Sequence, residues 1–113
     1  MKKLLFVCSQ NKLRSPTAET VFENTFDWEV RSAGLNHDAH IPLGTEDVEW
    51  ADYIFVMETT HKRKLQSKFS RVLKHQKVIC LNIPDNYEYM DESLITILKQ
   101  RIPQLVRQQT NKL

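Results

Sequence analysis

The apolar residues of this chain gather in short runs whose length suits β-strands better than helices. Runs at 4–7, 53–57 and 77–81 are largely apolar, which is typical of strands buried on both faces of a parallel sheet. Residues 28–32 alternate between apolar and polar side chains and predict one more strand. The pattern therefore predicts four strands.

Between the strands, apolar residues recur with the spacing of helices that bury one face. This spacing predicts helices over residues 15–26, 45–50 and 61–74, and a last helix that begins near residue 91. Pro103 lies inside the last helix and should kink or interrupt it, because proline lacks a backbone N–H. Strands that alternate with helices predict a three-layer α/β domain with a four-stranded parallel sheet.

The length and composition suit one small domain that covers residues 1–113. A net charge of +2 is too small to argue for a nucleic-acid partner. The two cysteines form no Cys-x-x-Cys pair, so they indicate neither a disulfide framework nor a zinc site, and a cytoplasmic location is expected. The apolar run at 4–7 is too short for a signal peptide, and no membrane association is expected.

A polar segment at residues 8–14 separates the first strand from the first helix. Ser15 is predicted to be the N-cap of that helix, and Pro16 suits its first position. Backbone N–H groups without partners point outward from a helix N-terminus, and the helix dipole favours negative charge there. The segment therefore predicts an anion-binding loop.

The side chains of this loop add chemistry to the anion site. Cys8 lies at its mouth, where the same N–H groups would stabilise a thiolate. Arg14 carries a planar fork of donors that can bind two oxygens of a phosphoryl group. Asn11 lies where the loop must reverse, and asparagine tolerates the left-handed conformation. The combination predicts phosphoryl transfer to a cysteine nucleophile.

At these positions the chain resembles the low-molecular-weight protein tyrosine phosphatase family. The family signature is a cysteine, five residues, an arginine and a serine directly after the first strand, and Cys8, Arg14 and Ser15 match it. Asn11 stands at the loop asparagine of the family. The resemblance implies a sheet of strand order 2-1-3-4 with helices on both faces, and a phosphocysteine intermediate that needs no metal or organic cofactor.

The resemblance also implies the roles of the loop residues. The substrate-binding residues would be Ser9, Gln10, Asn11, Lys12, Leu13 and Arg14, whose backbone N–H groups, with the Arg14 fork, hold the phosphoryl oxygens. Ser15 would donate a hydrogen bond to the Cys8 sulfur. Ser32, at the end of the second strand, would support the loop, although a serine there can also cap local backbone.

The resemblance identifies Asp85 as the general acid, in the loop after the fourth strand. The family has a proline after this aspartate, whereas this chain has Asn86. The alternative for Asp85 is a turn or cap residue after Pro84. Tyr87 and Tyr89 could line the pocket and stack on an aromatic substrate ring, or could instead be rim tyrosines that pack the loop.

This chain departs from the family pattern in three places. Gln10 stands where glycine is frequent, so its backbone turns with a Cβ present. Leu13 replaces the usual second loop cysteine, and the protective disulfide of relatives is therefore absent. Residues 36–50 are trimmed relative to the family.

Two further groups of residues allow a functional and a structural interpretation. His37, Asp38 and His40 could ligate a metal, but no further partner at ligand spacing is evident, so solvated loop residues are expected. Residues 61–77 are basic and contain no acidic residue. They could attract phosphorylated or nucleic-acid partners, but a solvated helix face is favoured because no aromatic residues are interleaved for base stacking.

The predicted function is hydrolysis of phosphotyrosine-type aryl phosphate esters by a monomer, with a phosphorylated protein or a small phosphate ester as partner. A non-catalytic phosphate-binding module is the main alternative. An arsenate reductase would need further cysteines, and only Cys80 exists, inside a predicted strand. A cysteine phosphocarrier would require neither Arg14 nor Asp85. Turnover of an aryl phosphate distinguishes the enzyme from the carrier and from the binding module.

Overall fold

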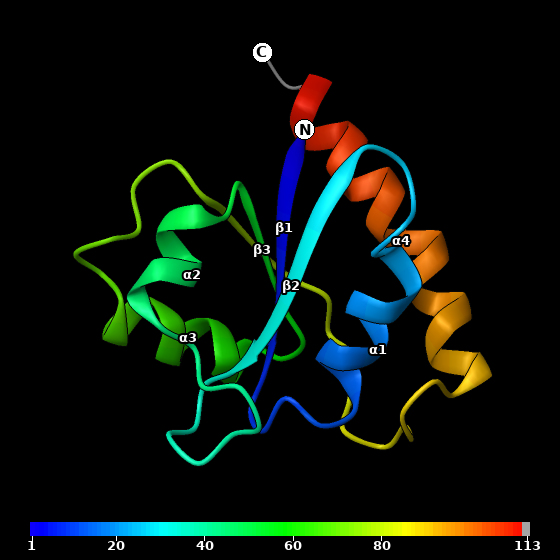
Figure 1. The fold of residues 1–113 in the computed structure, drawn as a ribbon, viewed down its shortest axis with the longest axis horizontal. Helices are drawn as coiled ribbons and strands as arrows, with labels where there is room; N and C mark the ends of the chain where they lie inside the picture. The colour runs from blue at the N-terminus through cyan, green and yellow to red at the C-terminus, as the bar shows by residue number, and fades with distance from the viewer. Residues whose placement is uncertain (112–113) are drawn as a thin grey trace.

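A computed structural model describes residues 1–111 and contains one four-stranded parallel sheet (Figure 1). The strands are β1 (Lys2–Cys8), β2 (Trp28–Gly34), β3 (Tyr53–Val56) and β4 (Lys77–Cys80). Their order across the sheet is β2-β1-β3-β4, and all three neighbouring pairs are parallel. The four strands and the order 2-1-3-4 predicted above are therefore confirmed.

Helices cover both faces of the sheet, which confirms the three-layer architecture. The helices are α1 (Arg14–Phe22), α2 (Thr45–Trp50), α3 (Thr59–Lys68) and α4 (Glu92–Asn111). In Figure 1, α1 and α4 lie on one side of the sheet and α2 and α3 on the other. None of the helices in the described chain is long and apolar enough to cross a membrane.

The alternating side chains of β1 supply both halves of the core. Leu4 and Phe6 face the α1 and α4 side, whereas Leu5 and Val7 face α2 and α3. The ring of Phe6 stacks on that of Phe55 at a centroid distance of 5.6 Å. Burying a side chain of this size contributes roughly 1.5–3 kcal/mol, and β1, one of the two interior strands, makes this contribution on both faces of the sheet.

The ends of two helices differ from the prediction. Leu13, not Ser15, is the N-cap of α1, because the hydroxyl of Ser15 is turned toward Cys8 instead of the helix backbone. The helix ends at Phe22, and Phe26 cannot extend it because its φ is 57°. Helix α3 ends at Lys68 and not near residue 74.

Pro103 does not interrupt α4, which continues through it as one helix. Its neighbours Ile102 and Val106 are buried against the sheet. The packing of this apolar face offsets the one backbone hydrogen bond that a proline cannot make.

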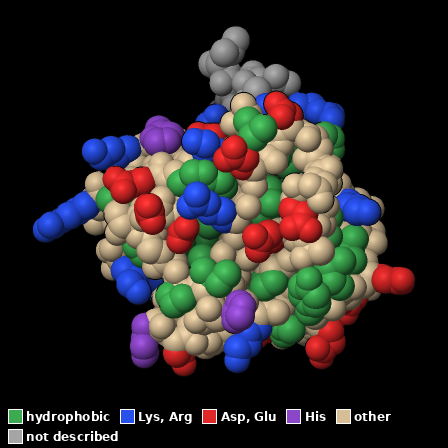
Figure 2. Space-filling view, viewed as in Figure 1, with side chains coloured by type: hydrophobic (Ala, Val, Ile, Leu, Met, Phe, Trp, Pro, Cys, Tyr) green, Lys and Arg blue, Asp and Glu red, His purple; other side chains and the backbone are tan. Residues whose placement is uncertain are grey.

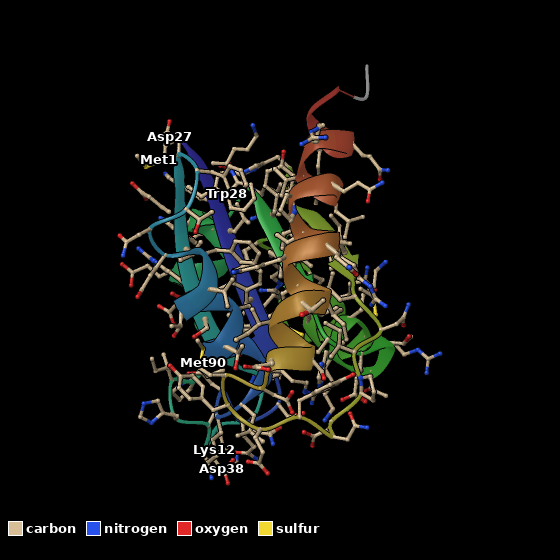
Figure 3. The ribbon with its side chains drawn as sticks, turned by 90° about the vertical axis from the view of Figure 1, so that its right-hand side faces the viewer. Met1, Lys12, Asp27, Trp28, Asp38 and Met90 are labelled. Atoms are coloured by element: carbon tan, nitrogen blue, oxygen red, sulfur yellow. The ribbon has the colours of Figure 1, made fainter. Side chains whose placement is uncertain are left out.

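The carboxyl ends of the strands meet at one edge of the sheet, where open α/β sheets bind ligands. Cys8 pairs with Gly34 of β2, and Val56 of β3 pairs with both Val7 and Cys80. Lys12 and Asp38 lie at this end of the molecule in Figure 3, whereas Met1 and Trp28 lie at the opposite end.

The strand order predicts that Cys8 and Cys80 do not form a disulfide. Strand β3 lies between their strands, and two strand spacings amount to about 9–10 Å, beyond the roughly 7 Å that a disulfide allows between Cα atoms. Peroxide should therefore convert Cys8 to sulfinic and sulfonic acids, and activity should not return with dithiol reductant. Peptide mapping of peroxide-treated protein tests this. A cross-linked Cys8–Cys80 peptide with full recovery would contradict it.

Candidate active site

Residues 9–13 connect β1 to α1 and form the β1–α1 loop. In its middle, Asn11 has a φ of 56°, in the left-handed region that asparagine adopts more readily than most residues with a side chain. Asn11 is only 1% exposed, so its amide needs hydrogen-bond partners inside the protein.

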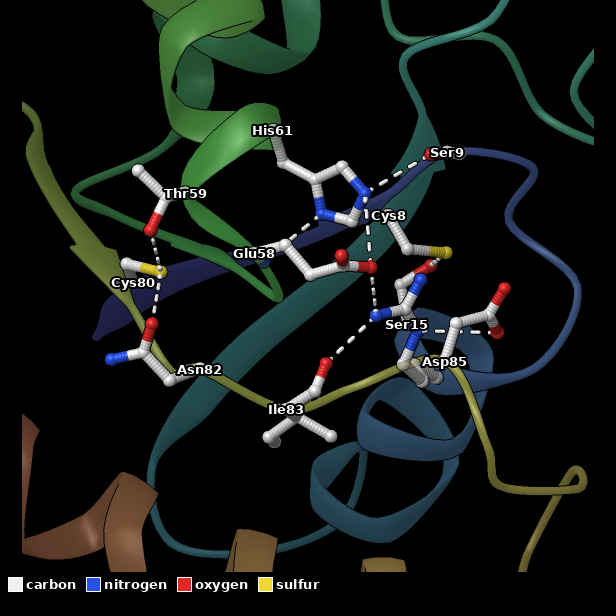
Figure 4. Close-up of polar contacts among 11 residues, drawn as sticks. Cys8, Ser9, Ser15, Glu58, Thr59, His61, Cys80, Asn82, Ile83 and Asp85 are labelled. Atoms are coloured by element: carbon white, nitrogen blue, oxygen red, sulfur yellow. Dashed lines mark hydrogen bonds and ion pairs between the residues drawn. The ribbon is translucent and has the colours of Figure 1, made fainter.

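The Asn11 amide begins a chain of hydrogen bonds that ends at the Cys8 sulfur. Its Nδ2 donates to Ser15 Oγ and to Ser32 Oγ, each at 2.9 Å. Ser32 Oγ in turn donates to Glu19 Oε1 at 2.6 Å. Because Ser15 Oγ accepts from Asn11, its own proton is available to the Cys8 Sγ, which lies 3.0 Å away (Figure 4). Ser15 is therefore oriented to stabilise a thiolate. Ser32 Oγ thereby connects Asn11 of the loop to Glu19 of α1.

The segment after β2 makes backbone hydrogen bonds to Cys8 and to the β1–α1 loop. The backbone N–H of Leu35 donates to the Cys8 carbonyl at 2.9 Å, and that of Asn36 donates to the Ser9 carbonyl at 3.0 Å. Gly34 makes this approach possible, since a Cβ there would lie 2.7 Å from the Ser9 carbonyl oxygen and 2.5 Å from the Ala39 Cβ. The two segments are packed too closely for any side chain at Gly34.

Arg14 is buried, with 4% exposed, and its guanidinium contacts the segments that follow β3 and β4. Its Nη1 donates to Glu58 Oε2 at 2.6 Å and to the Ile83 carbonyl at 2.8 Å. Its Nε lies 3.8 Å from Asp85 Oδ1. Because Nη1 is committed to Glu58 and Ile83, the Nε and Nη2 edge remains for a bidentate contact with an anion.

Glu58, directly after β3, keeps a negative charge beside this arginine. The hydrogen bond from the Arg14 guanidinium lowers the pKa of the Glu58 carboxyl below its ordinary value, although partial burial acts in the opposite direction. The ionised carboxylate fixes the Nη1 side of the guanidinium and thereby sets the direction of its free edge.

His61, in the first turn of α3, is buried with 3% exposed and holds the loop at Ser9. Its Nδ1 accepts the Glu58 backbone N–H at 3.1 Å. The neutral ring therefore carries its proton on Nε2, which donates to Ser9 Oγ at 3.0 Å. Burial lowers the pKa of His61, and the positive charge of Arg14 lowers it further. His61 is thus neutral at pH 7.

The lowered pKa of His61 predicts that stability falls as the pH is lowered. The unfolded chain takes up a proton near pH 6.5, whereas the buried ring stays neutral to lower pH, so protonation favours unfolding by at most about 1.4 kcal/mol per pH unit. The melting temperature should therefore drop between pH 7.5 and 5.5, and His61→Gln should reduce that drop. His75→Gln, at an exposed position, is the control. An equal pH dependence of wild type and His61→Gln would contradict the prediction.

These groups surround a small pocket of about 130 Å³. Its lining residues are Cys8, Ser9, Gln10, Lys12, Leu13, Arg14 and Asp85. Asp85 stands at the rim with its side chain 68% exposed, so it can move toward a bound group. The pocket is smaller than the usual site for a drug-sized ligand and has room for a phosphoryl group.

The two predicted tyrosines lie outside this lining. Tyr87 packs against the core beneath α1 and α4. The hydroxyl of Tyr89, which is 49% exposed, lies 2.9 Å from Thr20 Oγ1. Neither tyrosine therefore lines the pocket, and their contacts resemble those of tyrosines that pack the loop at the rim.

The sequence analysis missed Glu58 and His61. For Glu58, its position directly after the third predicted strand was an available signal, because parallel strands end at the ligand-binding edge of the sheet. No group of three His, Cys, Asp or Glu residues is placed to hold a metal ion within the described part of the chain.

No protein-family model matches the chain. Among curated proteins, a protein-arginine-phosphatase of Bacillus subtilis (strain 168) is 32% identical over 60% of this chain, and the match spans 63% of that protein. Among solved structures, a YwlE arginine phosphatase mutant with a phosphorylated active-site serine has 26% identity and a TM-score of 0.70, over 91% of this chain and 95% of its own. The low-molecular-weight protein tyrosine phosphatase of Streptococcus pyogenes has 18% identity and a TM-score of 0.76, over 93% of each chain, and shares the fold.

Proposed function

We propose that this chain, which shares the fold of low-molecular-weight protein tyrosine phosphatases and is 32% identical to a protein-arginine-phosphatase over 60% of its length, is a phosphatase of that family that works through a phosphocysteine. One observation carries this proposal. The Cys8 Sγ lies 3.0 Å from Ser15 Oγ in a loop whose arginine presents a free edge to the same pocket. Phosphoryl transfer to sulfur needs a nucleophilic thiolate, a donor that stabilises it and a group that binds the phosphoryl oxygens. Cys8, Ser15 and Arg14 can supply these three functions.

In the first step, the Cys8 thiolate attacks phosphorus in line, and the S–P bond forms as the bond to the leaving group breaks. Loop N–H groups and the Nε and Nη2 edge of Arg14 hold the equatorial oxygens. Asp85 donates its proton to the leaving group, which departs neutral. The exposed position of Asp85 at the rim suits this transfer.

In the second step, water attacks the phosphocysteine, and Asp85 now accepts the proton of the attacking water. The P–S bond breaks, and inorganic phosphate leaves. Ser15 Oγ donates to the departing Cys8 sulfur, which makes it a better leaving group. Glu58 and His61 hold the arginine and the loop in place, so little rearrangement is needed in either step.

The substrate class has two candidates. The sequence favoured phosphotyrosine, and the fold of a tyrosine phosphatase supports it. Phosphoarginine is supported by the two arginine phosphatases that are 32% and 26% identical to this chain. The pocket itself also supports it. Its lining combines the carboxylate of Asp85 with polar loop residues, while Tyr87 and Tyr89 lie elsewhere. As the proposed acid, Asp85 at the rim is placed to protonate the guanidino nitrogen that leaves phosphorus.

Asp85→Asn tests the proposed acid. It should lower kcat for phenyl phosphate by about 10²–10⁴, the usual contribution of a general acid. It should lower kcat for nitrophenyl phosphate by less than about tenfold, because nitrophenolate leaves without protonation. Asp38→Asn, at an exposed loop position, is the matched control. Equal losses with both esters would remove Asp85 from the acid role.

The same assay decides the reaction class and the substrate. Two peptides of one sequence, carrying phosphotyrosine or phosphoarginine, are compared by phosphate release. Faster phosphate release from one peptide identifies its phosphorylated residue as the preferred substrate. No release from either peptide or from the small esters would leave the protein as a phosphate-binding module and overturn the proposal.

A further inference from the structure

A second, larger pocket of about 510 Å³ lies beside the loop, between the segment after β2 and α3. It is lined by Leu35, Asn36, His37, Arg63, Lys64, Ser67 and Lys68. Three of these residues are permanently cationic and none is acidic. The pocket is therefore a concentrated positive site, and none of the reaction steps above uses it.

Lys64 and Lys68 lie four residues apart and therefore share one side of α3, and Arg63, which directly precedes Lys64, lines the same pocket. Within the side chains that the structure describes, no carboxylate lies in ion-pairing distance of Arg63, Lys64 or Lys68. Lys64 and Lys68 are four residues apart, and like charges at this spacing destabilise a helix. Basic side chains lie along the left edge of the face shown in Figure 2, over α3 and the segment that follows it. An anion bound here would relieve this repulsion.

The pocket shares a boundary with the active site. Leu35 and Asn36, which line it, donate their backbone N–H groups to the carbonyls of Cys8 and Ser9 at 2.9 and 3.0 Å. On the other side, α3 presents His61 to Ser9 and, half a turn to one turn later, Arg63 and Lys64 to the pocket. Because the two pockets adjoin along these hydrogen bonds, the flank of a residue bound in the active site lies next to the basic pocket.

We propose that this basic pocket binds acidic side chains that flank the phosphorylated residue of a protein substrate. The proposal rests on the proposed phosphatase function and adds a substrate preference to it. Carboxylates of a peptide suit the pocket because its charges are spread along a helix face. A single-stranded nucleic acid suits it less, because no aromatic ring is among the lining residues for base stacking.

The kinetic test uses two phosphopeptides that differ only in their flanks, which carry either glutamates or glutamines. The acidic peptide should have a kcat/KM about tenfold higher, through KM and not kcat, because the flank binds equally in ground and transition states. Arg63→Gln/Lys64→Gln/Lys68→Gln should abolish this preference and leave the turnover of nitrophenyl phosphate unchanged. Arg71→Gln/Lys74→Gln/Lys99→Gln removes the same charge at exposed positions outside the pocket and should keep the preference.

A binding test separates this proposal from the proposed function. A fluorescent glutamate-rich peptide without a phosphoryl group should bind the wild-type protein, weaken with added salt, and lose affinity in the pocket variant only. If no phosphopeptide is hydrolysed, the phosphatase proposal fails. The binding test then decides by itself whether the basic pocket binds acidic peptides. Equal losses of peptide affinity in the pocket variant and the control variant would contradict the proposed role of the pocket. Tighter, pocket-dependent binding of a single-stranded RNA of equal charge would overturn the assignment to acidic peptides.

Discussion

Replacing Cys8 with serine is expected to stop turnover while leaving the pocket able to bind phosphate. An alcohol is a far weaker nucleophile than a thiolate, and the surrounding groups that favour a sulfur anion do not ionise a hydroxyl. The loss should be at least about a thousandfold and should approach the order of 10⁶ that removal of an enzyme nucleophile costs. Steady-state hydrolysis of nitrophenyl phosphate measures it.

The serine variant offers a second readout. Because the proposed mechanism transfers the phosphoryl group to residue 8, incubation of Cys8→Ser with substrate should slowly yield protein heavier by one phosphoryl group, located at residue 8. Cys80→Ser is the matched control and should retain activity. Full activity of Cys8→Ser would disprove a cysteine nucleophile.

Arg14→Lys is expected to abolish most phosphate binding and to lower kcat/KM by about 10²–10³, the range for loss of one oxyanion donor. The wild-type protein at a phosphate concentration of 100 times Kd should gain about 2.7 kcal/mol of stability, which raises Tm by roughly 10 °C in a chain of this size. A lysine ammonium cannot bind Glu58, the Ile83 carbonyl and two phosphoryl oxygens in these directions at once. Thermal unfolding across a phosphate titration checks this.

Arg31→Lys makes the same chemical change at an exposed pair with Asp47, away from the pocket. Its response to phosphate should match that of the wild type. A wild-type Tm that does not change with phosphate, or an Arg14→Lys variant with an undiminished response, would count against the anion site.

The strands were predictable because they depend on strong local signals, whereas their order followed from the family resemblance. Apolar runs marked β1, β3 and β4, and the cysteine-to-serine signature after β1 linked the chain to a family whose order is 2-1-3-4. Helix ends were less predictable, since they depend on side chains that serve distant partners. Ser15 has the chemistry of an N-cap, but in the folded chain its hydroxyl faces Cys8.

The candidate site was predictable where its residues match the family pattern, in the loop signature and at Asp85. Cys8, Arg14 and Asn11 follow from the loop, whereas Glu58 and His61 reach it across the sheet from the end of β3. In the sequence, His61 opens a basic segment, and nothing local distinguishes it from the solvated residues that follow. Its burial depends on the position of α3 beside Ser9, which only the tertiary structure shows.

The two carboxylates around Arg14 differ in how firmly they hold the guanidinium. Glu58, at 2.6 Å, is a permanent counter-ion of the arginine, whereas Asp85, at 3.8 Å and mostly exposed, is a replaceable one. An incoming phosphoryl group displaces only the weaker contact. When phosphate departs, Asp85 returns to the guanidinium, so the buried cation always keeps a neighbouring anion at every stage of the proposed cycle.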